Sequence, residues 1–143
     1  MEVAAATVCT RALRLIRVLG GDESPAPGDL GTAFEGLASM LDGWAGDPGM
    51  VPDLASEFTM PGFTDVNDSV TIPEGSYGLL RMMTFNLAVE IAPEFGVEVP
   101  GYVQGVADES VRNWKTRVRA LHAGRITHEP LLIRKRPYNI LNG

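Results

Sequence analysis

Apolar side chains recur at three- and four-residue spacing in four separate stretches of the chain, and this spacing puts them on one face of an α-helix. The stretches cover residues 3–19, 27–45, 73–92 and 101–123, and each is followed by a glycine or a proline, residues that end helices. The pattern therefore predicts an all-α fold with an antiparallel four-helix body.

The apolar stripes also predict which side chains form the core. Leu37 lies in the middle of the second stripe and Leu87 in the middle of the third, so we expect both to be buried. Trp44 and Trp114 continue the stripes of their helices and are predicted to be core residues as well. The first and fourth stripes consist of Cys9, Ala12, Leu13, Ile16 and Leu19, and of Val103, Val106, Ala107, Ser110, Val111, Trp114, Val118 and Leu121.

Glycine and proline set the expected element boundaries. Gly20 and Gly21 are predicted to end the first helix, because glycine accepts the left-handed conformation that a helix C-terminus favours. Pro73 suits the first turn of the third helix, where its missing N–H would have no partner. Gly124 is expected to end the fourth helix, since it follows the last apolar positions of that stripe.

Two segments do not follow a helical pattern. Residues 47–72 are rich in Pro, Gly, Asp and Asn and are predicted to be loop with a small hairpin, whose short strands would be Glu57–Met60 and Val70–Ile72. The C-terminal segment contains two prolines and has neither a helical nor a strand period. The chain is therefore expected to consist of a helical domain at residues 1–125 and an extended arm at residues 126–143.

The composition predicts a soluble protein. Hydrophobic residues make up 45% and charged residues 21% of the 143 positions, which is ordinary for a globular domain. The longest apolar run is interrupted by Arg81 and Glu90, so no segment reaches the roughly 18 residues that a membrane span needs. Cys9 is the only cysteine, which excludes an internal disulfide and fits a reducing cytoplasm.

Charge is distributed unevenly along the chain. Of the 12 Lys and Arg residues, 8 lie after position 110, where Glu129 is the only acid, whereas 17 of the 18 acids lie before that position. Oppositely charged ends can attract a copy of the same molecule or an acidic partner. The simpler interpretation is a solvated face. We expect the contact between subunits to join a basic ridge to an acidic surface, formed by Arg112, Lys115 and Arg119 and by Asp22, Glu23 and Asp29.

Candidate chemistry is sparse. No phosphate-binding loop, dinucleotide fingerprint or nucleophile motif occurs. His122 and His128 are the only histidines, and a zinc site needs about four nitrogen or sulfur ligands, so neither a metal nor another cofactor is expected. Paired acids could serve as general acid and base, but acids at a helix start more commonly complement the helix dipole. These pairs are Asp108 with Glu109 and Glu90 with Glu94. The protein is predicted not to be an enzyme, and hydrolase chemistry is a minor alternative.

One polar side chain interrupts a buried pattern. Asn86 lies in the middle of the third predicted helix, beside Thr84, and asparagine is a weak helix former. If it is buried, its amide needs a hydrogen-bond partner. We expect this partner in the loop before Pro73, which gives Asn86 a structural role.

Four longer motifs are distributed along the chain between residues 6 and 143. Residues 6–29 and 33–47 read ATVCTRALRLIRVLGGDESPAPGD and AFEGLASMLDGWAGD, a small-residue helix, an acidic Ser/Pro linker and a Leu-rich helix that closes on Trp. Residues 63–100 read FTDVNDSVTIPEGSYGLLRMMTFNLAVEIAPEFGVEVP, and residues 138–143 read YNILNG. Together these motifs resemble the head-to-tail adaptor, or connector, proteins of tailed bacteriophages. The most similar type is the tail accessory factor of short-tailed phages.

The resemblance implies a structural virion protein that is made in the host cytoplasm and works at the head-tail junction. Such proteins form a homo-oligomeric ring, typically of twelve copies, that docks beneath the phage portal protein after DNA packaging. The ring extends the DNA channel and offers a platform to a downstream tail protein. DNA would pass through it without sequence-specific contact, and no membrane is involved. A small helical DNA-binding or regulatory protein is the alternative from another class.

Under this resemblance the C-terminal arm is expected to bind the portal. Its apolar residues would serve as anchors, and its three consecutive basic residues would steer it toward an acidic rim. A second interpretation is that the arm folds back on its own helical body. The expected portal-binding residues are Leu131, Leu132, Ile133, Arg134, Lys135, Arg136, Tyr138, Asn139 and Ile140.

Overall fold

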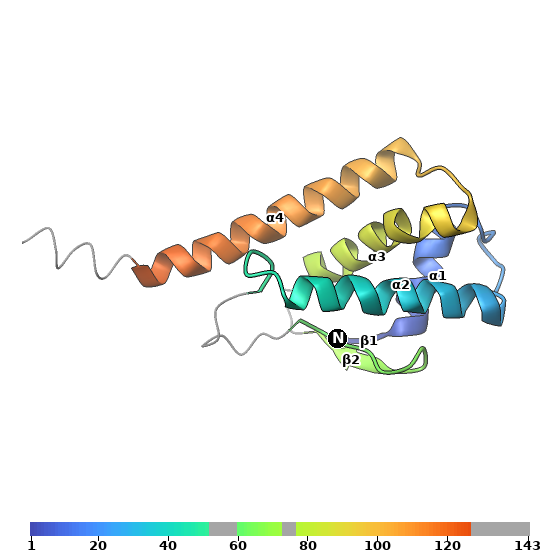
Figure 1. The fold of residues 1–143 in the computed structure, drawn as a ribbon, viewed down its shortest axis with the longest axis horizontal. Coiled ribbons are helices and arrows are strands. Elements are labelled where there is room, and N and C mark those ends of the chain that lie inside the picture. The colour runs from blue at the N-terminus through green and yellow to red at the C-terminus, as the bar shows by residue number, and fades with distance from the viewer. Residues whose placement is uncertain (52–59, 73–76, 127–143) are drawn as a thin grey trace, which may run out of the picture.

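A computed structural model describes residues 1–51, 60–72 and 77–126 of the chain, and these residues form a mostly helical protein (Figure 1). Four α-helices, one short 3-10 helix and one two-stranded sheet occur in the described residues. In chain order the elements are β1 (Glu2–Ala4), α1 (Ala5–Leu15), α2 (Pro27–Ala45), β2 (Ser69–Thr71), α3 (Tyr77–Ile91), η1 (Ala92–Phe95) and α4 (Gly101–Ile126).

Helix α3 is the central element, because it packs against α1, α2 and α4. Leu87 on α3 and Leu37 on α2 are both fully buried, which confirms the two predicted core positions. The predicted stripe of this helix was Tyr77, Leu80, Met83, Thr84, Leu87, Ala88 and Ile91. Leu79 and Met82, which lie outside that stripe, are fully buried as well. Since three helices surround α3, its apolar surface is wider than a single stripe. Burying a side chain of this size stabilises the fold by about 1.5–3 kcal/mol.

The first predicted helix begins too early, because the N-terminus is a strand. β1 pairs antiparallel with β2, and Val3 lies opposite Val70 in the register. The predicted hairpin is therefore wrong in its pairing: the segment around Val70 does form a strand, but its partner is the N-terminus. The other strand of the expected hairpin was Glu57–Met60, and residues 57–59 of it lie outside the described residues.

The predicted end of the first helix at Gly20 and Gly21 is also wrong. α1 ends at Leu15, and Arg17 adopts the left-handed conformation with φ 61°. The Arg17 N–H donates to the Arg14 carbonyl, and the Val18 N–H donates to the Leu13 carbonyl, each at 3.1 Å. These two bonds form a Schellman cap, which satisfies carbonyls at the helix end without a glycine. Leu19 beyond the cap remains buried.

Helix α2 has the bounds that the sequence predicted. Pro27 occupies its first turn and Asp29 lies near its positive end, both favourable positions. Trp44 is half-buried at the edge of the core, so its assignment as a core residue holds only in part. A Cβ atom at Gly36 would lie 2.7 Å from the Ile91 side chain. Glycine therefore permits α2 to approach α3 closely at this point.

The α3–α4 connection turns at Gly96, which has φ 65° in the left-handed region. The predicted α3 start at residues 73–76 lies outside the described residues, and the predicted α4 start agrees with Gly101. α4 continues through Gly124 to Ile126, which corrects its predicted end. Glycine in a helix interior costs about 1 kcal/mol relative to alanine, and this cost alone does not break a helix.

Helix α4 projects beyond the rest of the molecule. It has 26 residues, which correspond to a length of about 39 Å at the usual rise per residue. Figure 1 shows its C-terminal half extending past α2 and α3, and it also shows α2 lying across α1. The arm predicted for residues 126–143 overlaps α4 at Ile126, and residues 127–143 lie outside the described residues.

Candidate interaction surfaces

A hydrogen bond fixes the middle of α4 to the segment after α2. Trp114 is only 7% exposed, and its indole Nε1–H donates to the Met50 carbonyl at 2.6 Å. Arg117 lies over the ring of Trp114, with 6.0 Å between the guanidinium carbon and the ring centroid. The predicted core position of Trp114 is confirmed. Its hydrogen bond to Met50 joins the packing of α4 on α3 in holding α4 against the body.

Asn86 joins α3 to α4, so its expected partner in the loop before Pro73 is a wrong prediction. The Asn86 side-chain amide donates to the Met82 carbonyl at 2.8 Å within α3. The same nitrogen lies 3.3 Å from the Ala107 carbonyl and 3.4 Å from the Ser110 hydroxyl on α4. The residue has a structural role, as expected, but it acts between helices.

The predicted basic ridge lies on the projecting helix. Arg112 and Arg119 are exposed, and Lys115 is half-buried. Their spacing along α4 gives them one common side of the helix. Arg117 is a fourth exposed base in the same stretch, and the sequence analysis did not include it in the ridge. Arg117 lies on another side of α4, over the Trp114 ring, so the ridge itself consists of Arg112, Lys115 and Arg119.

The predicted acidic residues lie near the start of α2. Asp22 and Glu23 are exposed in the loop between α1 and α2, and Asp29 is half-buried in the first turn of α2. One oxygen of Glu23 accepts a hydrogen bond from the Gly20 N–H at 3.3 Å, and the Glu23 carbonyl accepts from Arg14 at 3.4 Å. The loop is thus held in place while its carboxylates face solvent.

The structure does not bring the predicted basic and acidic groups together within one molecule. Figure 1 shows the α1–α2 loop at one end of the molecule and the C-terminal half of α4 at the other. Any contact between these surfaces must therefore be made between two copies. All the predicted portal-binding residues, from Leu131 to Ile140, lie outside the described residues.

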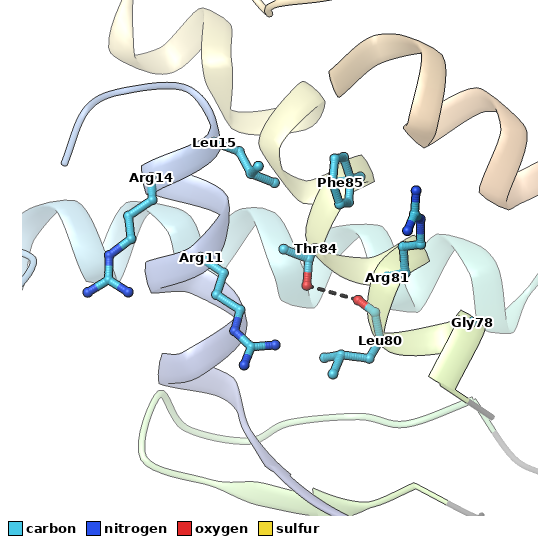
Figure 2. Close-up of a pocket in the computed structure, with 8 residues that line it drawn as sticks. All are labelled: Arg11, Arg14, Leu15, Gly78, Leu80, Arg81, Thr84 and Phe85. Atoms are coloured by element: carbon cyan, nitrogen blue, oxygen red, sulfur yellow. Dashed lines mark hydrogen bonds between the residues drawn. The ribbon is translucent and has the colours of Figure 1, made fainter. Parts of the chain in front are cut away.

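A groove between α1 and α3 is a further surface, which the sequence analysis missed (Figure 2). It has a volume of about 580 Å³ and is open to solvent. Leu15, Leu80 and Phe85 supply its apolar lining. Arg11 and Arg14 extend from α1 on one side, and the remaining lining residues are Gly78, Arg81 and Thr84 on α3. We call this surface the arginine groove.

The arginine groove combines positive charge with apolar surface. None of its lining residues is acidic, although residues 1–110 are predominantly acidic. Arg81 lies over the ring of Phe85 at 5.5 Å, a cation–π distance. The Thr84 hydroxyl donates to the Leu80 carbonyl at 2.9 Å, which satisfies the polar group on the groove wall. The groove is suited to an anionic group carried beside apolar side chains.

The sequence contained only part of the signal for this groove. Arg11 and Arg14 are three residues apart and must share a side of their helix. Arg81 is distant in sequence, and only the packing of α1 against α3 brings it to the same groove. A smaller pocket of about 230 Å³ lies on the other side of Arg81, between α3 and α4, and it includes Arg117 and Glu109.

Cys9 and the acids are candidates for chemistry or metal binding by residue type. Cys9 is fully buried, and burial raises the pKa of its thiol to about 12, so it remains protonated at neutral pH. No group of three or more His, Cys, Asp or Glu residues that could hold a metal occurs in residues 1–51, 60–72 and 77–126. In these ranges no helix is long and apolar enough to cross a membrane.

Local hydrogen bonds shift the pKa of one acid, Asp68, which has a structural role. Asp68 accepts hydrogen bonds from the Thr64 N–H and hydroxyl, both at 3.1 Å, and from the Ser69 N–H at 3.0 Å. These bonds lower the pKa of Asp68 by stabilising its charged form. Asp68 therefore organises the turn that leads into β2.

Comparison with known proteins adds no relative. No protein-family model, curated protein or solved structure matches the chain.

Proposed function

We propose that the protein is a head-to-tail adaptor of a tailed bacteriophage, which forms a ring beneath the portal, extends the DNA channel and provides the attachment platform for the tail. The support from the sequence is the set of four motifs that resemble this family. The support from the structure is the separation of two oppositely charged surfaces at opposite ends of one helical body. A contact between unlike surfaces of identical subunits repeats, and it produces a ring when the rotation closes.

The observation that carries this proposal is the position of the basic ridge on a helix that projects from the body. A projecting α4 can reach a neighbouring copy, and the acidic α1–α2 loop offers that neighbour a complementary surface. Exposed ion pairs are each worth only about 0–1 kcal/mol. Weak repeated contacts favour assembly on a portal template over assembly in free solution.

The proposal includes an antiparallel arrangement of the helices, for which the left-handed turn at Gly96 between α3 and α4 is the support. It also assigns the arm to the portal and the whole assembly to the head-tail junction of the virion. The subunits would act without catalysis and without a cofactor.

The subunit contact is tested by charge reversal with rescue. The variant Arg112→Glu, Lys115→Glu, Arg119→Glu should remain a folded monomer but fail to form rings when mixed with the cognate portal. Electron microscopy and mass photometry would measure ring formation. A second variant that carries Asp22→Lys, Glu23→Lys and Asp29→Lys in addition should regain rings, because the attraction is restored with opposite signs. Normal rings from the first variant would refute this contact.

The arm is tested by deletion of residues 127–143. The truncated protein should keep its melting temperature within a few degrees and lose its affinity for the portal, measured by co-sedimentation. A truncated protein that still binds the portal contradicts the role of the arm. A protein that unfolds indicates instead that the arm packs on its own body.

The exposed bases of α4 also favour a second candidate function, a DNA-binding or regulatory protein. That function requires a monomer or dimer whose affinity for DNA falls steeply as salt rises. Measuring DNA binding at two salt concentrations, together with the molecular mass in the presence of portal, separates the two candidates.

A further inference from the structure

The arginine groove has the character of a binding site for an acidic, partly apolar protein segment. Arg11 stands on the α1 wall and Arg81 on the α3 wall, so each wall offers a guanidinium group to a carboxylate of a bound segment. Arg14 lies at the rim and points away from α3, where it donates to the Glu23 carbonyl. Leu15, Leu80 and Phe85 leave apolar surface between them. Its volume of about 580 Å³ falls in the range of roughly 300–1,000 Å³ in which protein pockets hold ligands.

Three stretches of the chain lie outside the described residues. They differ in charge and in apolar side chains, and these differences decide which of them could bind in the arginine groove. Residues 127–143 carry Arg134, Lys135 and Arg136, which the groove would repel. Residues 73–76 contain no large apolar side chain. Residues 52–59 contain two acids, two large apolar residues and no base. Only residues 52–59 therefore complement the groove in both charge and hydrophobicity.

The spacing within residues 52–59 would, in a helical turn, place one row of acids beside one row of apolar side chains, which suits an apolar groove with a charged wall. Leu54 and Phe58 are four residues apart, and so are Asp53 and Glu57. Residues with this spacing share one side of a helical turn, which is the arrangement by which helical segments enter apolar grooves. Each apolar anchor is thus preceded directly by an acid.

We infer that the arginine groove binds residues 52–59 of a neighbouring copy of the chain. Leu54 and Phe58 contact Leu15, Leu80 and Phe85, while the carboxylates of Asp53 and Glu57 pair with the groove arginines. This inference rests on the proposed ring, because the ring supplies the neighbour, and it adds a second and more apolar contact to the charged ridge.

The position of the segment favours a neighbour over the same copy. Residues 52–59 follow the C-terminal end of α2, whereas α1, which forms one wall of the groove, crosses α2 nearer its N-terminal end (Figure 1). The Met50 carbonyl, two residues before the segment, also accepts the hydrogen bond from Trp114 on α4.

The inference is tested with a fluorescent peptide of residues 51–60 added to the full-length protein, with binding measured by anisotropy. Saturable binding is expected below about 1 mM, and the variant Arg11→Glu, Arg81→Glu should weaken it about tenfold or more. A peptide with Asp53→Lys and Glu57→Lys should bind that variant better than it binds the unaltered protein. The matched control, Arg112→Glu with Arg119→Glu, has the same net charge as the groove variant and should lose much less affinity.

Mixing two altered proteins tests whether the contact is made between copies. One carries Arg11→Glu and Arg81→Glu, and the other carries Asp53→Lys and Glu57→Lys. Each should fail to form rings on the portal alone. Mixed with each other, the two proteins should form rings in which they alternate, because each altered groove then meets the altered segment of the other protein. A contact within one copy would stay broken in both proteins, so a mixture without rings contradicts a contact between copies.

Several results would overturn the inference. One is a peptide that does not bind at about 1 mM; another is a peptide that binds the groove variant as well as the unaltered protein. Peptide binding that occurs only after residues 52–59 are replaced by a Gly-Ser linker would mean that the segment occupies its own groove. Normal rings from the groove variant would show that the groove takes no part in ring formation, and they would not contradict the proposed function. Absence of rings from the unaltered protein would contradict the proposed function, and the peptide measurement is independent of that result.

Discussion

The body formed by α1, α2 and α3 differs from α4 in how each buries its surface. In the body, the core cluster includes residues from all three helices, and α3 is covered on several sides. On α4 the buried positions Val103, Ala107, Trp114 and Val118 form one narrow stripe, and most other described side chains are exposed or half-buried. Helix α4 therefore adds one face to the same core through Val103, Trp114 and Val118 and leaves its other faces available for partners.

The largest expected effect is a core truncation in the body. Leu87→Ala and Leu37→Ala should each lower the free energy of unfolding by about 2–5 kcal/mol, because both side chains are fully buried. Reversible chemical denaturation measures this loss. A loss below about 1 kcal/mol would mean that these two leucine side chains are not tightly packed in the core.

The contact between α4 and the body is tested by Trp114→Phe. The change removes the indole N–H and leaves the buried Met50 carbonyl without this donor. A lost donor to a buried acceptor costs about 1–3 kcal/mol. Denaturation should show this loss with a single transition. Two separate transitions would instead show that α4 unfolds independently of the body.

The close approach of α2 and α3 is tested by Gly36→Ala. The added Cβ would lie 2.7 Å from Ile91, and such overpacking costs about 1–3 kcal/mol, partly offset by the better helix propensity of alanine. Gly31→Ala is the matched control on the same helix, since no atom lies within 4 Å of its added Cβ. It should stabilise the protein by up to about 1 kcal/mol. Equal effects of the two changes would contradict the close packing.

The smallest effect is expected on the exposed side of α4. Arg119→Ala should change the free energy of unfolding by less than about 0.5 kcal/mol, because the side chain is exposed and no core contact is lost. Thermal and chemical denaturation provide the measurement. A loss above about 1 kcal/mol would show that the basic surface is part of the folded core of the monomer.

Local patterns predicted the helices well where glycine and proline agreed with the apolar period. Helix α2 has the predicted bounds, and the start of α4 and the core positions Leu37 and Leu87 were predicted correctly. The sequence interpretation was wrong where a local rule competed with a longer-range contact. The α1 helix stops at a Schellman cap with Arg17 in place of glycine, and the apolar N-terminus joins a strand that lies far along the chain.

The candidate surfaces divide in the same way. The basic ridge was predicted because Arg112, Lys115 and Arg119 are neighbours on one helix, where residue spacing alone fixes which side chains share a face. The arginine groove was not predicted, because Arg11 and Arg81 belong to different helices. Their proximity depends on how α1 packs against α3.

The sequence by itself determined the mostly helical character, the apolar stripes and the separation of acidic from basic segments, since these depend on residue spacing within a few turns. Tertiary structure alone decided the pairing of β1 with β2, the Asn86 contacts with α4, the arginine groove and the projection of α4 beyond the body. Each of these depends on side chains brought together from distant positions. Such contacts form only when the packing of the whole core compensates the entropy of closing long loops.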